Sequence, residues 1–152
     1  MTGPDGHLDG WPVHPDQVTL PLDPPPPRQW RLDLPYRRPP LSLNDRHGHW
    51  AARHRAVEQV RADVGWLVRQ AKIPRLRRAA VQLHYQPRAA GRRDADNLTA
   101  TSKPCVDALV SAGVLADDTP AFVDQLMPVI HPPAAAAPEH GSRLWLTIRE
   151  AR

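Results

Sequence analysis

The sequence predicts a single α+β domain in which helices pack on a mixed β-sheet. Three observations lead to this prediction. The 152 residues suit one hydrophobic core. Segments whose hydrophobic residues alternate, as in strands, are interspersed with segments of helical spacing. Their order along the chain is strand, helix, strand, helix, strand, strand, which favours one layer of helices on a sheet. We place this domain at residues 29–152, after a proline-rich tail at residues 1–28 that we expect to be disordered.

The first half of the domain predicts one strand and one long helix. The first strand is indicated by alternating Trp30, Leu32 and Leu34. A polar loop at residues 35–49 follows. An amphipathic helix is then expected from Trp50 to Lys72, ended by Pro74, because hydrophobic residues recur there at spacings of three and four.

The second half predicts three further strands and a second helix. The first of these strands carries Val81, Leu83 and Tyr85. The helix is expected over Pro104 to Ala112, because proline is tolerated in a first turn and Gly113 is a typical stop. An earlier start at Asp96–Asn97 stays open, although Pro104 would then lie inside the helix. The remaining strands are expected at Phe122 to Ile130, where Pro128 favours an edge, and around Leu144, Leu146 and Ile148.

Charge is distributed unevenly along this chain of net charge +4. Residues 28–93 hold 16 basic and 4 acidic residues, a net of +12. Such a block is expected of a protein that binds a phosphate backbone, and the alternative is a solvated arginine surface. Cys105, the one cysteine, excludes an internal disulfide and is expected to be buried. No apolar run is long enough for a membrane span and the N-terminus does not resemble a signal peptide, so we expect a cytoplasmic protein that makes no membrane contact.

An acidic run, RRDADNLTATSKPCVDALVSAGVLADD, follows the basic block and holds five aspartates between Arg92 and Asp118. Asp94 and Asp96 lie two residues apart at the expected end of the second strand, and in extended backbone such residues point to one side. Two crowded carboxylates repel unless a cation lies between them, and Mg²⁺, Ca²⁺ and Mn²⁺ prefer oxygen ligands. The alternative is that Asp96 or Asn97 caps a helix. Carboxylates within a surface that attracts DNA suit a metal-dependent nuclease.

The motifs RRDADNL, a lysine, DAL, AGV and DDT resemble the core of the RusA family of Holliday junction resolvases. The segments LPYRRPPLSLNDRHGHW and RLWLTIRE also resemble that family's first strand with its asparagine-bearing loop and its last strand. The resemblance implies a homodimer that binds four-way DNA junctions in recombination and repair, and that nicks two opposing strands with Mg²⁺ or Mn²⁺.

The resemblance also implies roles for individual residues. The family's essential acids correspond to Asp94, Asp96 and Asp118, and its lysine corresponds to Lys103. Apart from the resemblance, we expect Asp117 to be a further metal ligand. DNA binding is expected from Arg92, Arg93, Asn44 and Arg46. Lys103 lies farther from Asp96 than is common in the family, as if three residues were inserted within Thr99 to Ser102. We expect a metal-dependent endodeoxyribonuclease; the alternative is an inactive DNA-binding protein of the same fold, acting as a regulator or chaperone of junctions.

Overall fold

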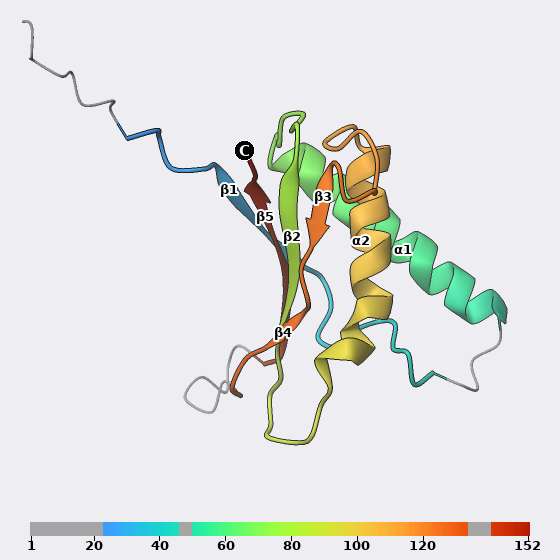
Figure 1. The fold of residues 1–152 in the computed structure, drawn as a ribbon. Helices are drawn as coiled ribbons and strands as arrows, with labels where there is room; N and C mark the ends of the chain where they lie inside the picture. Colours follow the sequence, from blue (N-terminus) through green and yellow to red (C-terminus); the bar gives the residue numbers. More distant parts are fainter. Residues whose placement is uncertain (1–22, 46–49, 134–140) are drawn as a thin grey trace, which may run out of the picture.

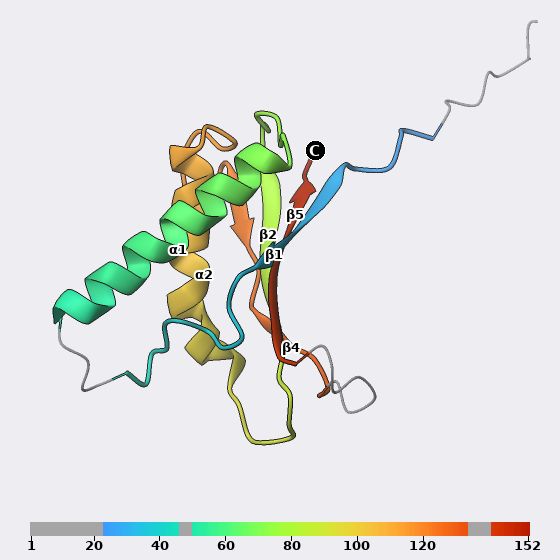
Figure 2. The ribbon, with the colours of Figure 1, turned by 180° about the vertical axis from the view of Figure 1, so that it is seen from behind.

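A mixed five-stranded β-sheet carries both α-helices on one face (Figure 1, Figure 2). The computed structural model describes residues 23–45, 50–133 and 141–152. The strand order is β1-β5-β2-β3, and β4 also pairs with β2. In chain order the elements are β1 (Gln29–Leu34), α1 (Trp50–Gln70), β2 (Ala79–Gln86), the 3₁₀ turn η1 (Ala95–Leu98), α2 (Thr99–Ser111), β3 (Val123–Gln125), β4 (Val129–Ile130) and β5 (Arg143–Glu150). The predicted α+β class is confirmed.

The alternating strands bury one face of the sheet beneath the helices. β5 runs antiparallel to both β1 and β2, and Leu146 lies opposite Leu32 on one side and Leu83 on the other. All three leucines are buried in the core. The odd- and even-numbered side chains of a strand point to opposite faces, so this register places the buried leucines of all three strands on the helix side.

Helix α1 packs its valine face on the core and ends slightly earlier than expected. Val60, Val64 and Val68 are buried. The helix ends at Gln70, and Lys72 adopts a left-handed backbone with φ of 51°. The amide of Ile73 then donates to the carbonyl of Val68 at 3.3 Å, a closure typical of a helix C-terminus.

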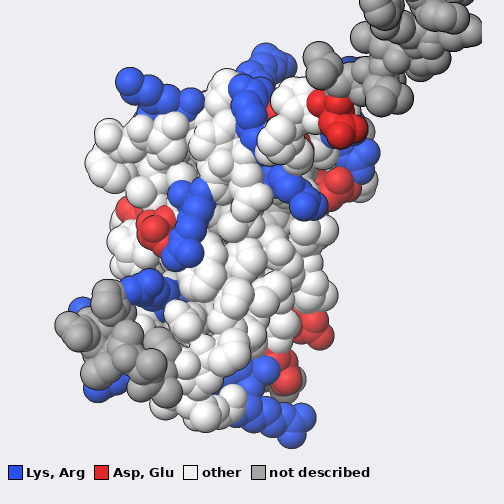
Figure 3. Space-filling model, turned by 90° about the vertical axis from the view of Figure 1, so that its left-hand side faces the viewer, with Lys and Arg blue, Asp and Glu red and all other residues white. Residues whose placement is uncertain are grey.

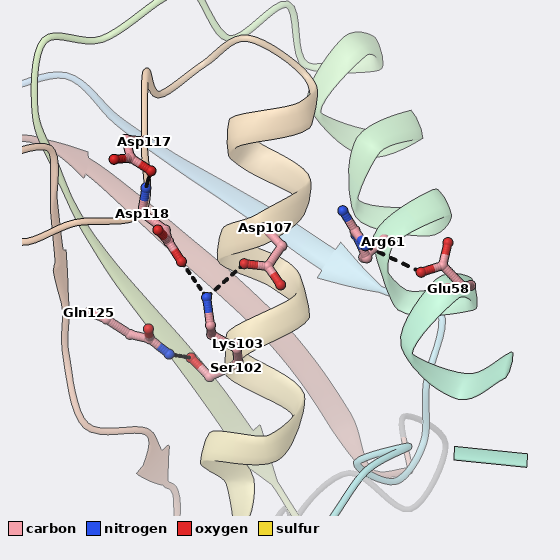
Figure 4. A network of polar contacts seen from close by, with 8 residues as sticks. All are labelled: Glu58, Arg61, Ser102, Lys103, Asp107, Asp117, Asp118 and Gln125. Carbon is pink, nitrogen blue, oxygen red and sulfur yellow. Dashed lines mark hydrogen bonds and ion pairs between the residues drawn. The ribbon is translucent and has the colours of Figure 1, made fainter. Parts of the chain in front are cut away.

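The expected start of the second helix was wrong, because α2 begins at Thr99 and contains Pro104 in its interior. Proline removes one helical hydrogen bond, so other contacts must hold the first turns. The buried Thr101 hydroxyl accepts from the amide of Leu41 at 3.2 Å and donates to the carbonyl of Leu41 at 2.8 Å. The neighbouring Ser102 hydroxyl accepts from Gln125 at 3.0 Å (Figure 4). Tertiary hydrogen bonds therefore stabilise a start that local preference disfavours.

The segment from Phe122 to Ile130 forms two short strands rather than one. β3 and β4 both pair in parallel with β2, and Pro128 lies in the break between them. Proline has no amide to donate to a sheet, which explains the interruption. Both crossovers, through α1 and through α2, place their helices on the same face.

The opposite face of the sheet is free of helices, and Figure 3 looks onto it. Its central part is largely uncharged, and basic and acidic side chains lie mostly toward the margins (Figure 3). Trp145 lies on this face, stacked on His84 with ring centroids 5.2 Å apart and covered by the guanidinium of Arg31 at 4.3 Å. Trp145 is thereby largely shielded from solvent without a helix above it.

The remaining sequence-based expectations concern the tail, Arg46, Cys105 and membrane-spanning helices. Residues 1–22 of the predicted tail and Arg46 lie outside the described residues. Residues 23–28 form no regular element and are exposed, and Arg28 pairs with Glu150 at 2.8 Å. Cys105 is buried, as expected. None of the helices in the described ranges has an apolar stretch long enough to cross a lipid bilayer.

Candidate functional site

Helix α2 and the segments that flank it carry the acidic run. Asp94 and Asp96 lie at its N-terminal end, and Lys103 lies in its second turn. The loop after α2 reverses direction, so that Asp118 returns to contact the Lys103 ammonium group (Figure 4). The C-terminal end of the run therefore meets the second turn of the helix, whereas Asp94 and Asp96 stay at the start of the helix.

Lys103 bridges two carboxylates. Its Nζ donates to Asp107 Oδ1 at 2.8 Å and also to the carboxylate of Asp118 (Figure 4). The hydrogen bond to Asp107, followed by that to Asp118, raises the pKa of Lys103. The hydrogen bond from Lys103 in turn lowers the pKa of Asp118. Because the lysine side chain is 54% exposed, these contacts orient the ammonium group more than they stabilise the fold.

The structure corrects the expected geometry of Asp94 and Asp96. Strand β2 ends at Gln86, so neither aspartate belongs to it. Asp94 has an extended backbone with φ of −104° and ψ of 127°, whereas Asp96 lies within the η1 turn. The argument that an extended chain aims both carboxylates the same way therefore does not apply.

The capping alternative is also wrong for these residues. The position before η1 is occupied by Asp94, whose side chain makes no cap hydrogen bond. The corresponding position of α2 is Leu98, which has no polar side chain, and the structure assigns that end no side-chain cap. Both aspartates are exposed, and neither takes part in an ion pair within the described ranges. Neither carboxylate therefore has the capping role that is usual for an aspartate at the start of a helix.

The four expected metal ligands form two pairs rather than one cluster. Asp94 and Asp96 precede α2, whereas Asp117 and Asp118 follow it, with Asp117 Oδ1 accepting from the Asp118 amide at 2.8 Å. Within the part of the chain that the structure describes, no three Asp, Glu, His or Cys side chains converge as a metal site. The Asp118 carboxylate is engaged by Lys103. Carboxylate oxygens are ligands that hard cations prefer, so these four aspartates are chemically suited to such a cation. Asp118 would become a ligand only after its contact with Lys103 is broken.

A pocket of about 590 Å³ adjoins Asp94. Its lining includes four arginines, Arg38, Arg88, Arg92 and Arg93. None of the ion pairs formed between described residues involves these four side chains. The pocket therefore concentrates positive charge beside the aspartates, as a site for phosphate requires.

The structure places the expected DNA-binding residues unequally. Arg92 and Arg93 line the pocket. Asn44 is exposed, and its backbone N–H donates to Ser42 Oγ at 3.2 Å, but Asn44 does not line the pocket. Arg46 lies beyond the described ranges.

Sequence reasoning missed the contribution of Asp107 and of two pocket arginines. Asp107 was not expected to take part in the site, and the structure shows it bound to Lys103. The spacing of four between these residues on one helix is the signal that predicts this contact. Arg38 and Arg88 come from separate loops, and only the fold brings them together.

The chain was compared with known proteins. It matches no protein-family model, and no curated protein is significantly similar to it. Functional inference therefore depends on the side chains and on their arrangement.

Proposed function

We propose that the chain is an endodeoxyribonuclease that requires Mg²⁺ or Mn²⁺ and cuts branched DNA. One observation carries the proposal. Asp94 and Asp96 are exposed carboxylates without a cap or an ion pair within the described ranges, and Asp94 borders a pocket rimmed by arginines. Carboxylates at that place repel the anion that the arginines attract, and a divalent cation removes the conflict.

The chain's own side chains have separate roles in this proposal. Arg92 and Arg93 bind phosphates next to the cleaved bond. Asp94 and Asp96 would hold the cation, and Asp118 would join them only if its contact with Lys103 were broken. A bound divalent cation polarises the phosphodiester and lowers the pKa of a water molecule.

Lys103 is suited to stabilise negative charge that develops on the phosphate or on the leaving oxygen. Its ammonium group is already oriented by two carboxylates. If Asp118 became a metal ligand, the 2.8 Å contact with Asp107 would still hold Lys103 in place. The helix thus supplies the anchor for the lysine, Asp107, and the loop after the helix supplies the second carboxylate, Asp118.

The resemblance of the acidic run to RusA resolvases supports a four-way junction as the substrate. It also supports a homodimer, since paired nicking of opposing strands needs two sites related by symmetry. We include both in the proposal, with a role in DNA recombination and repair.

A second candidate function is a junction-binding regulator or chaperone that does not cut. It is favoured by one observation: Asp118 is bound to Lys103, and the acidic pairs on the two sides of α2 do not converge within the described residues. Such a protein keeps the arginine pocket but never assembles a metal site.

Incubation with a synthetic four-way junction tests the proposal. Each strand is labelled in turn, and products are compared with Mg²⁺, with Mn²⁺ and with EDTA. We expect symmetric nicks in two opposing strands with either metal and none with EDTA, while a linear duplex of the same sequence stays intact. Binding without nicking under all three conditions would favour the regulator.

A further inference from the structure

The pocket beside Asp94 has the make-up of a nucleotide site, with an apolar floor and a basic rim. Its walls come from chain segments that are distant in sequence: the loop after β1, the end of β2 with the loop that follows it, η1, β4 and the residue before β5. Its volume of about 590 Å³ lies within the range of roughly 300–1,000 Å³ that is typical of small-molecule sites. A phosphate group alone would not need a cavity of this size.

The floor offers an aromatic and aliphatic surface. Tyr85 and Leu98 line it and are each 6% exposed, so they are held rigidly by the core. Pro39 and Ile130 extend this surface and are partly buried. The parts of these side chains that reach the pocket offer apolar contact to a planar base, whichever base it is.

The rim supplies charge for a phosphate. Arg38, Arg88 and Arg92 are exposed and have no ion-pair partner among the described side chains. Arg93 is anchored through Nη1, which donates to the carbonyl of Ala89 at 3.0 Å. Guanidinium groups bind phosphate oxygens in pairs of hydrogen bonds, so this rim suits a phosphate monoester or diester.

Polar groups between the floor and the rim suit the edge of a base. Asn97 lines the pocket, and its side-chain amide makes no hydrogen bond within the described ranges. Ser142 Oγ accepts from the amide of Arg88 at 3.1 Å and retains a hydroxyl hydrogen to donate. An amide and a hydroxyl both donate and accept, which favours tolerance of several bases.

We propose that this pocket binds a single unstacked nucleotide, with the base on the Tyr85 floor and the 5′-phosphate on Arg38 and Arg88. The inference rests on the proposed function, since branched DNA is where such a nucleotide arises. Removing a base from the stack costs least where it is already poorly paired, as at a branch point. A nucleotide in the pocket places the adjoining phosphate beside Asp94. Binding of the branch-point nucleotide therefore also positions the bond to be cleaved.

Binding of mononucleotides to the full chain in EDTA tests the pocket without any cutting. The probes are 2′-deoxyadenosine 5′-monophosphate, deoxyadenosine and inorganic phosphate, measured by saturation-transfer NMR and by competition. We expect the monophosphate to bind at least about tenfold more tightly than either fragment, because it uses floor and rim together. Saturation should be strongest on the protons of the base.

Paired variants with equal loss of charge locate the site. In Arg38→Ala with Arg88→Ala, affinity for the monophosphate should fall roughly tenfold or more. In the control, Arg53→Ala with Arg69→Ala, two exposed arginines of α1 outside the pocket are removed and affinity should hold. Equal affinity for phosphate and monophosphate, or equal loss in both variants, would overturn the inference.

A four-way junction with 2-aminopurine at the branch point connects the pocket to DNA. Its fluorescence rises when the base leaves the stack, so wild-type protein in EDTA should raise it and the Arg38/Arg88 variant should not. Binding without that rise would refute the unstacked nucleotide. The two proposals fail separately: monophosphate binding without metal-dependent nicking refutes the nuclease alone, and nicking without monophosphate binding refutes the pocket alone.

Discussion

Replacement of Asp94 or Asp96 by asparagine separates a metal ligand from a structural aspartate. The amide keeps the shape of the carboxylate, but it carries no charge and is a poorer ligand for a hard cation. Neither side chain caps a helix or forms an ion pair within the described ranges. We therefore expect the free energy of unfolding to change by less than about 0.5 kcal/mol, the usual range for surface substitutions. Loss of a true cap costs about 1 kcal/mol, which corresponds to roughly 2–4 °C in Tm for a domain of this size.

The same variants should gain affinity for DNA in the absence of metal. Two unit charges about 5 Å apart in water interact with roughly 0.8 kcal/mol before salt screening. Removing a negative charge that faces a phosphate should therefore tighten junction binding by up to about fourfold at low salt. Metal-dependent nicking, in contrast, should collapse.

Three measurements on each variant decide the matter: Tm, junction affinity in EDTA, and nicking with Mg²⁺. Asp33→Asn is the matched control, because Asp33 is an exposed aspartate that binds Arg31 at 2.7 Å on the helix-free face of the sheet. It should nick normally. A variant of Asp94 or Asp96 that melts several degrees lower yet still nicks would refute the metal-ligand role.

Three further predictions concern other parts of the structure. Replacing Arg92 and Arg93 by alanine should weaken binding to all DNA sequences. The slope of log affinity against log salt concentration should fall by up to about 0.9 per lost phosphate contact. An unchanged slope would mean that both side chains face solvent. The hydrogen bonds of Lys103, first to Asp107 and then to Asp118, raise its pKa, and the hydrogen bond from Lys103 lowers the pKa of Asp118. These exposed contacts should therefore add a small stabilisation of the fold between the ordinary carboxyl value of 3.8 and the ordinary ammonium value of 10.5. That contribution disappears as pH falls through the lowered pKa of Asp118 or rises through the raised pKa of Lys103. The free energies of unfolding in urea of wild type and Lys103→Met should therefore differ between these limits and converge outside them. Lys72→Gly should stabilise the chain by about 0.5–1 kcal/mol, because glycine adopts the positive φ at that position without strain; a lower Tm would contradict this.

Hydrophobic periodicity was enough to predict the elements whose residues alternate or recur at helical spacing. The strand at residues 29–34, the strand around Leu83, the final strand and the long helix all appear within a few residues of their predicted bounds. This agreement has a physical cause, since burial on one face imposes a period of two on strands and a period near 3.6 on helices. The acidic run was also visible as a pattern, because its composition departs from the basic block before it.

The spatial arrangement of that run could not be predicted from periodicity, because it depends on contacts with distant segments. Helix α2 passes through Pro104 because Thr101 and Ser102 find partners in Leu41 and Gln125, which no local pattern reveals. Asp118 reaches Lys103 because the loop after the helix reverses. Arg38 and Arg88 meet because the chain after β1 lies beside the chain after β2. Periodicity records which side of an element is buried, whereas the position of a loop side chain depends on contacts between distant segments, and those contacts exist only in the folded chain.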